Sequence, residues 1–132
     1  MKKLKINSSQ MVANARARIE EIESVDLISQ LGNEELVIID IRDLRERERM
    51  GFIPGSMHMP RGMIEFWVDP ESPYFKEIFA EDKKFVLHCA AGWRSALTAA
   101  TLQDMGFEVA HLKEGFATWE QDGGPVEFLK KD

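Results

Sequence analysis

Two short, nearly continuous apolar runs interrupt a chain whose other segments mix polar and apolar residues. Residues 36–41 read Leu-Val-Ile-Ile-Asp-Ile, and residues 85–87 read Phe-Val-Leu. Strands that are apolar on both faces are typical of parallel sheets covered by helices on each side. Residues 107–112 alternate between apolar and polar side chains and predict a third strand.

Segments with a helical spacing of apolar residues separate these strands. The first covers residues about 9–21, and we expect residues 1–21 to be an N-terminal helical extension and residues 22–132 the folded domain. Other helices are predicted at residues 25–31, 42–49, 74–79, 95–105 and 115–121. The densely charged helix at 42–49 is expected to present its charges to solvent. Strands alternating with helices predict an α/β domain with a mainly parallel sheet.

Composition excludes some classes of protein but does not indicate a reaction. The chain has 132 residues, enough for one domain, and a formal net charge of −6. This acidic balance argues against a general binder of nucleic acid or of anionic membranes, since both need a basic face. No apolar run approaches the length that spans a membrane. With a single cysteine there is no intrachain disulfide, and we expect a soluble cytoplasmic protein.

That one cysteine, Cys89, follows the predicted strand at 85–87 and precedes the predicted helix at 95–105. The carboxyl end of a parallel strand is where the functional crevice of such sheets lies. The N–H groups and dipole of a helix N-terminus favour a thiolate over the thiol, and Arg94 adds a fixed positive charge. We therefore predict a catalytic Cys89 in a substrate-binding loop made of Ala90, Ala91, Gly92, Trp93, Arg94 and Ser95.

This loop is compatible with two chemistries. A thiolate ringed by N–H groups and an arginine can bind a phosphate, as in cysteine-based phosphatases. It can also carry a sulfane sulfur as a persulfide, whose terminal sulfur is anionic and takes the same donors. Four residues separate Cys89 from Arg94, one fewer than in the phosphatase pattern. The smaller ring favours a single sulfur atom over a tetrahedral phosphoryl group.

Other polar residues have simpler interpretations. Asp40 and Arg42, at the end of a predicted strand, are expected to support the loop structurally through an ion pair. His88 should point away from Cys89 because successive side chains of a strand face opposite ways. His111 is interpreted as structural. The three histidines and one cysteine lack any regular metal-ligand spacing, so no metal site and no cofactor are predicted.

Four elements in the same order give the chain a resemblance to the rhodanese family of sulfurtransferases, over residues about 22–127. They are the strand and Asp-x-Arg ending at 37–42, the Gly-Phe-Ile-Pro-Gly-Ser element at 51–56, the loop at 89–95, and the Gly-x-x-x-Trp ending at 115–119 followed by Gly-Pro-Val at 124–126. The resemblance implies a five-stranded parallel sheet with helices on both faces and a persulfide at Cys89. The chain departs from the family pattern at Phe52, where histidine is usual.

The resemblance also implies partners and leaves alternatives. The implied donor is thiosulfate, a polysulfide or a persulfide. Its acceptor is a thiol or another thiophile, on a small molecule or an acceptor protein. Ala90 and Ala91 lack the charged side chains that some thiosulfate-using relatives carry. A non-catalytic rhodanese-like binding or regulatory module, or a cysteine-based phosphatase or arsenate reductase, remains an alternative.

Overall fold

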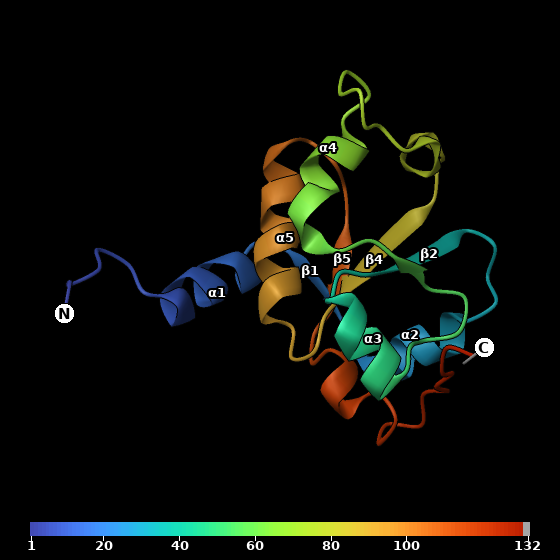
Figure 1. Ribbon diagram of the computed structural model, residues 1–132. Helices are drawn as coiled ribbons and strands as arrows, with labels where there is room; N and C mark the ends of the chain where they lie inside the picture. Colours follow the sequence, from blue (N-terminus) through green and yellow to red (C-terminus); the bar gives the residue numbers. More distant parts are fainter. Residues whose placement is uncertain (131–132) are drawn as a thin grey trace.

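The computed structural model describes residues 1–130, and its strands form one parallel sheet of five in the order β1-β5-β4-β2-β3. The strands are β1 Glu20–Ile22, β2 Leu36–Asp40, β3 Met57–His58, β4 Lys84–His88 and β5 Ala110–Leu112. The helices are α1 Ser8–Arg16, α2 Ser24–Gln30, α3 Leu44–Met50, α4 Ile64–Val68 and α5 Trp93–Asp104, with the 3-10 turns η1 Arg61–Met63, η2 Glu77–Ala80 and η3 Phe116–Thr118. The α/β class and the five-stranded parallel sheet are as predicted (Figure 1).

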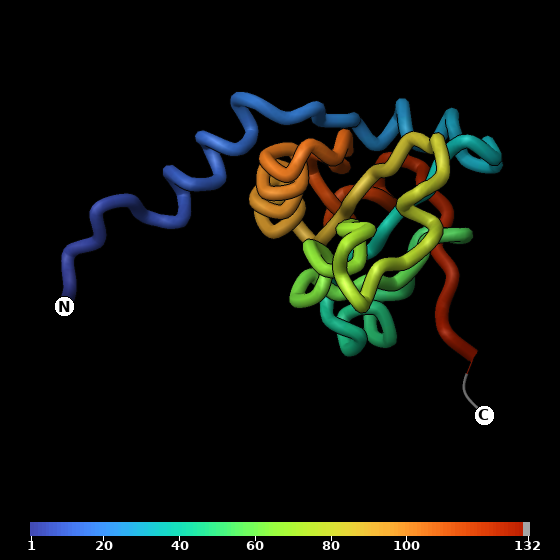
Figure 2. Tube along the Cα trace, turned by 90° about the horizontal axis from the view of Figure 1, so that it is seen from above, coloured from blue at the N-terminus to red at the C-terminus, as the bar shows by residue number. Residues whose placement is uncertain are grey.

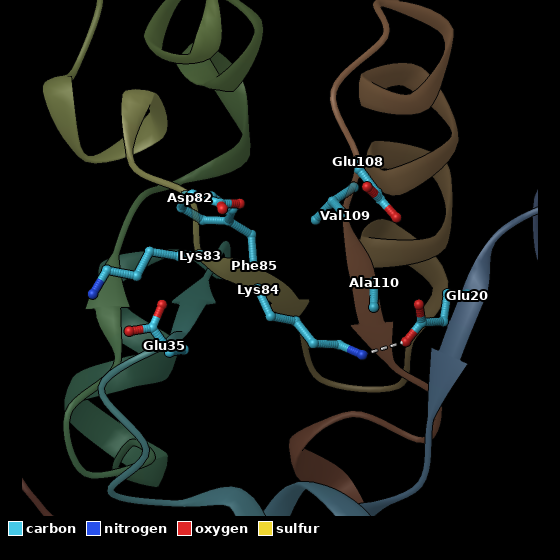
Figure 3. A pocket seen from close by; sticks show the side chains of 9 residues that line it. All are labelled: Glu20, Glu35, Asp82, Lys83, Lys84, Phe85, Glu108, Val109 and Ala110. Atoms are coloured by element: carbon cyan, nitrogen blue, oxygen red, sulfur yellow. Dashed lines mark hydrogen bonds and ion pairs between the residues drawn. The ribbon is translucent and has the colours of Figure 1, made fainter.

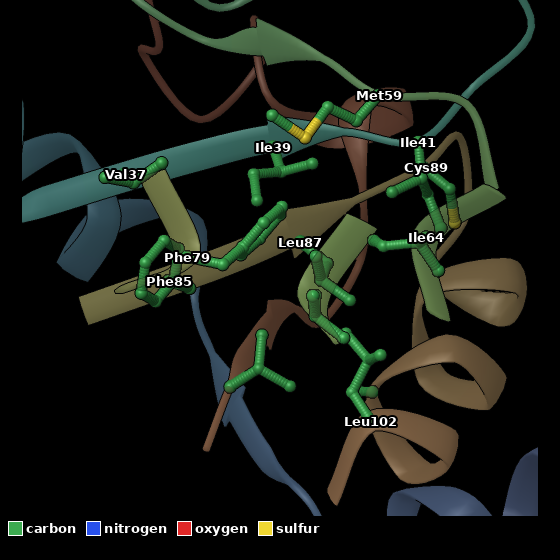
Figure 4. Close-up of a cluster of buried hydrophobic side chains, with 13 residues drawn as sticks. Val37, Ile39, Ile41, Met59, Ile64, Phe79, Phe85, Leu87, Cys89 and Leu102 are labelled. Carbon is green, nitrogen blue, oxygen red and sulfur yellow. The ribbon is translucent and has the colours of Figure 1, made fainter. Parts of the chain in front are cut away.

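Alternation along the central strands divides the core into two layers. Ile39 and Leu87 face one side of the sheet, where they pack with residues of α4 and α5. Ile38 and Val86 face the other side, where residues of α2 and η3 cover them. Successive side chains of a strand point to opposite faces, so a run that is apolar throughout serves both layers. Cys89 lies at one end of the first cluster (Figure 4).

The N-terminal segment differs from the predicted helix. Helix α1 ends at Arg16, and Glu20–Ile22 is the edge strand β1, which pairs with β5 in parallel. The helix predicted over residues about 9–21 is therefore wrong at its end, because pairing with a distant strand overrides the local pattern. Strand β1 also crosses the boundary expected at residue 21. The chain before α1 extends away from the sheet in both views (Figures 1 and 2).

Small side chains attach α1 to the rest of the molecule. Ala15 is buried against Ala96 and Ala100 of α5, which lets the two helices approach closely. Between α1 and β1, Arg18 pairs with Asp104 near the end of α5. Within residues 1–130, no helix has both the length and the apolar character required to cross a membrane.

Candidate active site

Cys89 follows β4 directly and is buried, with 1% of its surface exposed. The chain turns through Ala90 and Ala91 and reaches Gly92, which has a φ of 83° and precedes the first residue of α5. Only glycine adopts that conformation without strain. A β-carbon at Gly92 would also lie 2.2 Å from the carbonyl oxygen of Lys113, so the loop needs glycine for space as well.

Two backbone N–H groups converge on the sulfur atom. Gly92 N–H donates to Cys89 Sγ at 3.2 Å, and Ser95 N–H donates at 3.4 Å. Ser95 is in the first turn of α5, where N–H groups have no partner within the helix. Donors aimed at an acceptor favour its negatively charged form, as does the positive end of the helix dipole.

The carbonyl groups of Cys89 and Ala90 point towards the turn η3. Cys89 O accepts from Phe116 N–H and Ala90 O accepts from Ala117 N–H, each at 2.9 Å. A trans peptide directs its N–H opposite to its C=O, so the N–H groups of Ala90 and Ala91 face away from η3. The turn η3 thus holds the loop with its carbonyls on one side and leaves these N–H groups on the other.

Gly115 makes this attachment possible. It has a φ of 70°, and a β-carbon there would lie 2.6 Å from Ala90 O and 2.8 Å from Cys89 O. The chain can pass this close to the loop because Gly115 has no side chain.

Arg94 does not hydrogen-bond to the sulfur. Its guanidinium donates to both carboxylate oxygens of Glu46 on α3, at 2.7 and 2.9 Å. The hydrogen bond to Glu46, partly opposed by burial, raises the pKa of Arg94, and the charge of Cys89 contributes in the same direction. The hydrogen bond from Arg94 likewise lowers the pKa of Glu46. Sequence reasoning placed Arg94 in the loop but missed Glu46, which balances most of its charge.

Trp93 points into solvent at the start of α5. Its side chain is 66% exposed and lines a cavity of about 450 Å³ together with residues of α1. A second cavity, of about 390 Å³, lies on the other side of the loop, between Ala90, η3 and α3. Both cavities adjoin the loop that covers Cys89.

Beneath the loop lies a buried ionic cluster around Asp40. Arg42 donates to both carboxylate oxygens of Asp40 at 2.9 Å, and Arg47 Nη1 donates at 3.1 Å. Burial acts to raise the pKa of Asp40, but the hydrogen bonds and nearby positive charges outweigh it and lower this pKa to about 2. Asp40 and Arg42 thus form the ion pair expected of loop support. Burial of Arg42 and Arg47 corrects the prediction that the charges of the segment 42–49 all face solvent.

His88 occupies the face of the sheet opposite Cys89. It is fully buried, stacks on Phe116 at 5.9 Å between ring centroids, and has Nε2 3.8 Å from Asp40 Oδ1. Burial lowers the pKa of His88 to about 4, and the charge of Asp40 only partly opposes this. His88 is therefore neutral near pH 7 and is not directed at the sulfur.

His111, which was interpreted as structural, lies on the same side of the sheet as the site and contacts one residue of the loop. Strand β5 pairs Leu87 of β4 with His111, so His111 faces the same side of the sheet as Cys89. Its Nδ1 lies 2.7 Å from Ser95 Oγ, and its Nε2 lies 2.9 Å from Glu21 Oε2. Sequence reasoning missed this contact because Glu21 and His111 meet only through the strand order.

A further cavity, of about 330 Å³, lies at the amino ends of the strands, opposite the end that carries Cys89 (Figure 3). Carboxylates and lysines line it in mixture, and Lys84 pairs with Glu20 across it at 2.7 Å. Among the described residues, no group of three or more His, Cys, Asp or Glu side chains is arranged to hold a metal ion.

Curated relatives resemble the chain at modest identity. A sulfurtransferase of Allochromatium vinosum is 28% identical over 82% of this chain and 94% of its own length. The thiosulfate sulfurtransferase/rhodanese-like domain-containing protein 3 of Mus musculus is 30% identical over 71% of this chain and 64% of its own length.

Solved structures extend the comparison. A Rhodopseudomonas palustris protein, described as being of unknown function and a possible tyrosine phosphatase, is 50% identical, with a TM-score of 0.91 over 96% of this chain and 98% of its own. A rhodanese-related protein of Thermoplasma volcanium has the same fold, with 24% identity and a TM-score of 0.66 over 83% of this chain and 99% of its own. The protein-family model that describes the rhodanese-like domain matches residues 24–122 of this chain. The chain therefore belongs to the family of rhodanese-like domains.

Proposed function

We propose that this protein is a sulfurtransferase that carries a sulfane sulfur as a persulfide on Cys89. One observation carries the proposal: the N–H groups of Gly92 and Ser95 converge on the sulfur of the only cysteine in the chain. They stabilise a thiolate before the reaction. A persulfide is also anionic, and the remaining N–H groups of the loop and of the first turn of α5 are available to its outer sulfur.

The reaction has two displacement steps. In the first, the Cys89 thiolate attacks the outer sulfur of the donor, an S–S bond forms to Sγ, and the donor remnant leaves with the electron pair of the broken bond. In the second, a thiophilic acceptor attacks the outer sulfur, and Sγ departs as the thiolate. The protein alternates between two covalent forms, with no net redox change.

Phosphoryl transfer is the competing chemistry. It is considered because a related structure is described as a possible tyrosine phosphatase. Two observations favour sulfur. Only four residues separate Cys89 from Arg94, and the Arg94 guanidinium is engaged by Glu46 at two positions instead of facing the loop. A phosphoryl group has three oxygens to bind and would need that guanidinium.

The acceptor comes from outside the chain, because no second cysteine can attack a Cys89 persulfide. Ala90 and Ala91 offer no charged side chain to a dianionic donor. A low-molecular-weight persulfide, which carries a single negative charge on its sulfur, therefore suits the loop better than thiosulfate. The acceptor is a thiol or another thiophile, free or on a protein, and we place the reaction in the cytoplasm.

Intact-mass measurement tests the proposal directly. The protein is incubated with polysulfide, with a small persulfide and with thiosulfate, and the Cys89→Ala variant serves as the control. We expect one added sulfur atom on the unchanged protein and none on the variant. Adding cyanide or a small thiol should return the original mass and release thiocyanate or a new persulfide.

Two results would contradict the proposal. If no donor adds sulfur while a small haloacetamide still alkylates Cys89, the domain is a binding module rather than a sulfurtransferase. If an aryl phosphate is hydrolysed and Cys89→Ala abolishes the hydrolysis, the protein is a phosphatase.

A further inference from the structure

A continuous line of polar side chains, buried at the sulfur and partly exposed at its other end, runs from Cys89 to the N-terminal segment. Cys89 Sγ lies 3.5 Å from Ser95 Oγ, which lies 2.7 Å from His111 Nδ1. The other ring nitrogen of His111 lies 2.9 Å from Glu21 Oε2, and Arg16 forms an ion pair with the same carboxylate. Ser95 and His111 are fully buried. We use the term Ser95–His111 relay for the four side chains Cys89, Ser95, His111 and Glu21.

The hydrogen atoms along the relay have only one consistent arrangement when His111 is neutral. Burial acts to raise the pKa of Glu21, but hydrogen bonds from His111 and Arg16 outweigh it and lower this pKa, so Glu21 is ionised. An ionised carboxylate only accepts, so His111 carries its hydrogen on Nε2. Nδ1 is then the acceptor, and Ser95 Oγ–H donates to it. Ser95 Oγ in turn accepts from the Cys89 thiol.

We propose that His111, acting through Ser95, is the base that removes the proton from Cys89. The S–H proton moves to Ser95 Oγ while the Ser95 hydroxyl proton moves to His111 Nδ1. The products are a thiolate, an intact serine hydroxyl that now donates to it, and an imidazolium held by Glu21. No atom or electron leaves the site, and the reverse movement restores the thiol. The relay serves the proposed sulfurtransferase and rests on that function.

The Glu21 carboxylate favours this transfer, whereas burial opposes it. Burial lowers the pKa of His111 and outweighs the hydrogen bond to Glu21, so the ring becomes a better base only through the negative charge that forms on Cys89. Before transfer, the ring faces one negative charge, on Glu21, and one positive charge, on Arg16. After transfer, it faces a second negative charge on Cys89. Arg94 is paired with Glu46 and so competes less for the thiolate.

Glu21 and Arg16 also give the N-terminal segment a role. Both precede residue 24, where the match to the family model begins. Arg16 donates at 3.1 Å to the carbonyl of Lys113, next to which Gly92 packs. Helix α1 and strand β1 therefore act as part of the site: they hold the carboxylate that stabilises protonated His111.

The test is the rate at which iodoacetamide alkylates Cys89 as a function of pH, which needs no sulfur donor. In His111→Asn the amide can still accept from Ser95 but is not basic. In Glu21→Gln the hydrogen-bond acceptor stays and the charge is removed. We expect the midpoint of the alkylation profile to rise by about one pH unit in His111→Asn, with the rate near pH 6 falling about tenfold. The plateau at high pH should not change, because hydroxide then removes the proton directly.

Glu21→Gln should shift the midpoint in the same direction by a smaller amount, and Glu21→Asp should restore part of the shift. His58→Gln changes a histidine whose ring hydrogen-bonds to the carbonyl of Arg42 and to no group of the relay, and should leave the profile unchanged. Thermal unfolding of each variant checks that it is folded. Because Glu21 is on an edge strand, Glu21→Gln tests the relay even if His111→Asn does not fold.

A profile unchanged in both Glu21→Gln and folded His111→Asn would overturn the relay. A rate reduced by the same factor at every pH would also overturn it, because that result means lost access rather than a lost base. Sulfur loading distinguishes the two proposals. If the midpoint shifts but no donor adds sulfur, the relay stands and the sulfurtransferase proposal fails. If sulfur loads normally and no midpoint shifts, only the relay fails.

Discussion

Arg94 and Glu46 form a two-point ion pair, with Nη1–Oε1 at 2.7 Å and Nη2–Oε2 at 2.9 Å. The pair joins the first turn of α5 to the first turn of α3, so it links the loop over Cys89 to the segment that follows β2. Both side chains are about one-third exposed. The Glu46 carboxylate therefore reduces the attraction between the Arg94 guanidinium and an approaching anion.

Replacing Glu46 by glutamine should make the loop more attractive to anions. Removing the carboxylate uncovers the Arg94 charge, and an unpaired charge acts strongly at short range. We expect the ratio of iodoacetate to iodoacetamide alkylation rates to rise about threefold. Glu48→Gln, on the exposed side of the same helix, removes the same charge without touching Arg94 and is the control. An equal rise in both variants would mean that only net charge matters.

Gly115→Ala should weaken the site through a steric clash. The new methyl group would lie within 2.8 Å of the carbonyl oxygens of Cys89 and Ala90. Gly55→Ala is a matched control, because Gly55 has a φ of 81° but no atom within 4 Å of the new carbon. We expect Gly55→Ala to lower the free energy of unfolding by about 1 kcal/mol, from backbone strain alone. Gly115→Ala should cost clearly more and should also slow alkylation of Cys89. Equal costs in denaturant titrations would contradict the clash.

Asp40→Asn should destabilise the fold severely. It leaves Arg42 and Arg47 buried with no compensating charge, which typically costs about 3–5 kcal/mol. Asp104→Asn breaks an ion pair with Arg18 in which both side chains are exposed, and should change the unfolding free energy very little. Urea titration of the two variants measures the contrast. A small effect at Asp40 would show that the arginines find other partners.

The neutral, buried His88 makes stability depend on pH. Its pKa is about 4 in the folded protein and near 6.5 in an unfolded chain. Between those values the unfolded chain binds a proton that the folded protein does not, so the free energy of unfolding falls as pH falls from 6.5 to 4. The loss attributable to His88 is about 3 kcal/mol. The lowered pKa of Asp40, about 2, adds a further loss below about pH 4.

His88→Gln removes the titrating group, so urea titrations between pH 7 and pH 4.5 should show a shallower loss of stability in this variant. His58→Gln is the control and should keep the full slope. His111, whose pKa is also lowered by burial, contributes a decline of the same sign in all these proteins. If the slope of His88→Gln equals that of the unchanged protein, His88 is not neutral in the fold.

The sequence predicted the fold where long-range structure agrees with local pattern. The runs at 36–41 and 85–87 contribute β2 and β4, because strands buried on both faces are apolar along their whole length. Glu20 and Glu21 were predicted as the end of a helix, since the three residues of β1 carry no strand signal of their own. Their conformation is decided by backbone pairing with β5, which lies about ninety residues further along the chain.

The candidate site, like the fold, could be predicted from the sequence only in part. The loop from Cys89 to Ser95 is contiguous, so its chemistry could be predicted from spacing and from the helix that follows. Glu21, His111 and Glu46 reach it from three other elements, and their approach depends on the strand register and on the angle of α3. The burial of Arg47 was missed because it lies in a dense run of charged residues most of which are exposed.

Strand order has a consequence for how this protein is made. Within residues 1–130, β5 is the last strand, yet it is the only strand that pairs with β1, the first. A nascent chain emerging from the ribosome can therefore expose Cys89 long before β1 has anything to pair with. His111 and Glu21 come together only when β5 inserts between β1 and β4. If the relay operates as proposed, synthesis keeps the thiol at low reactivity until the sheet is complete.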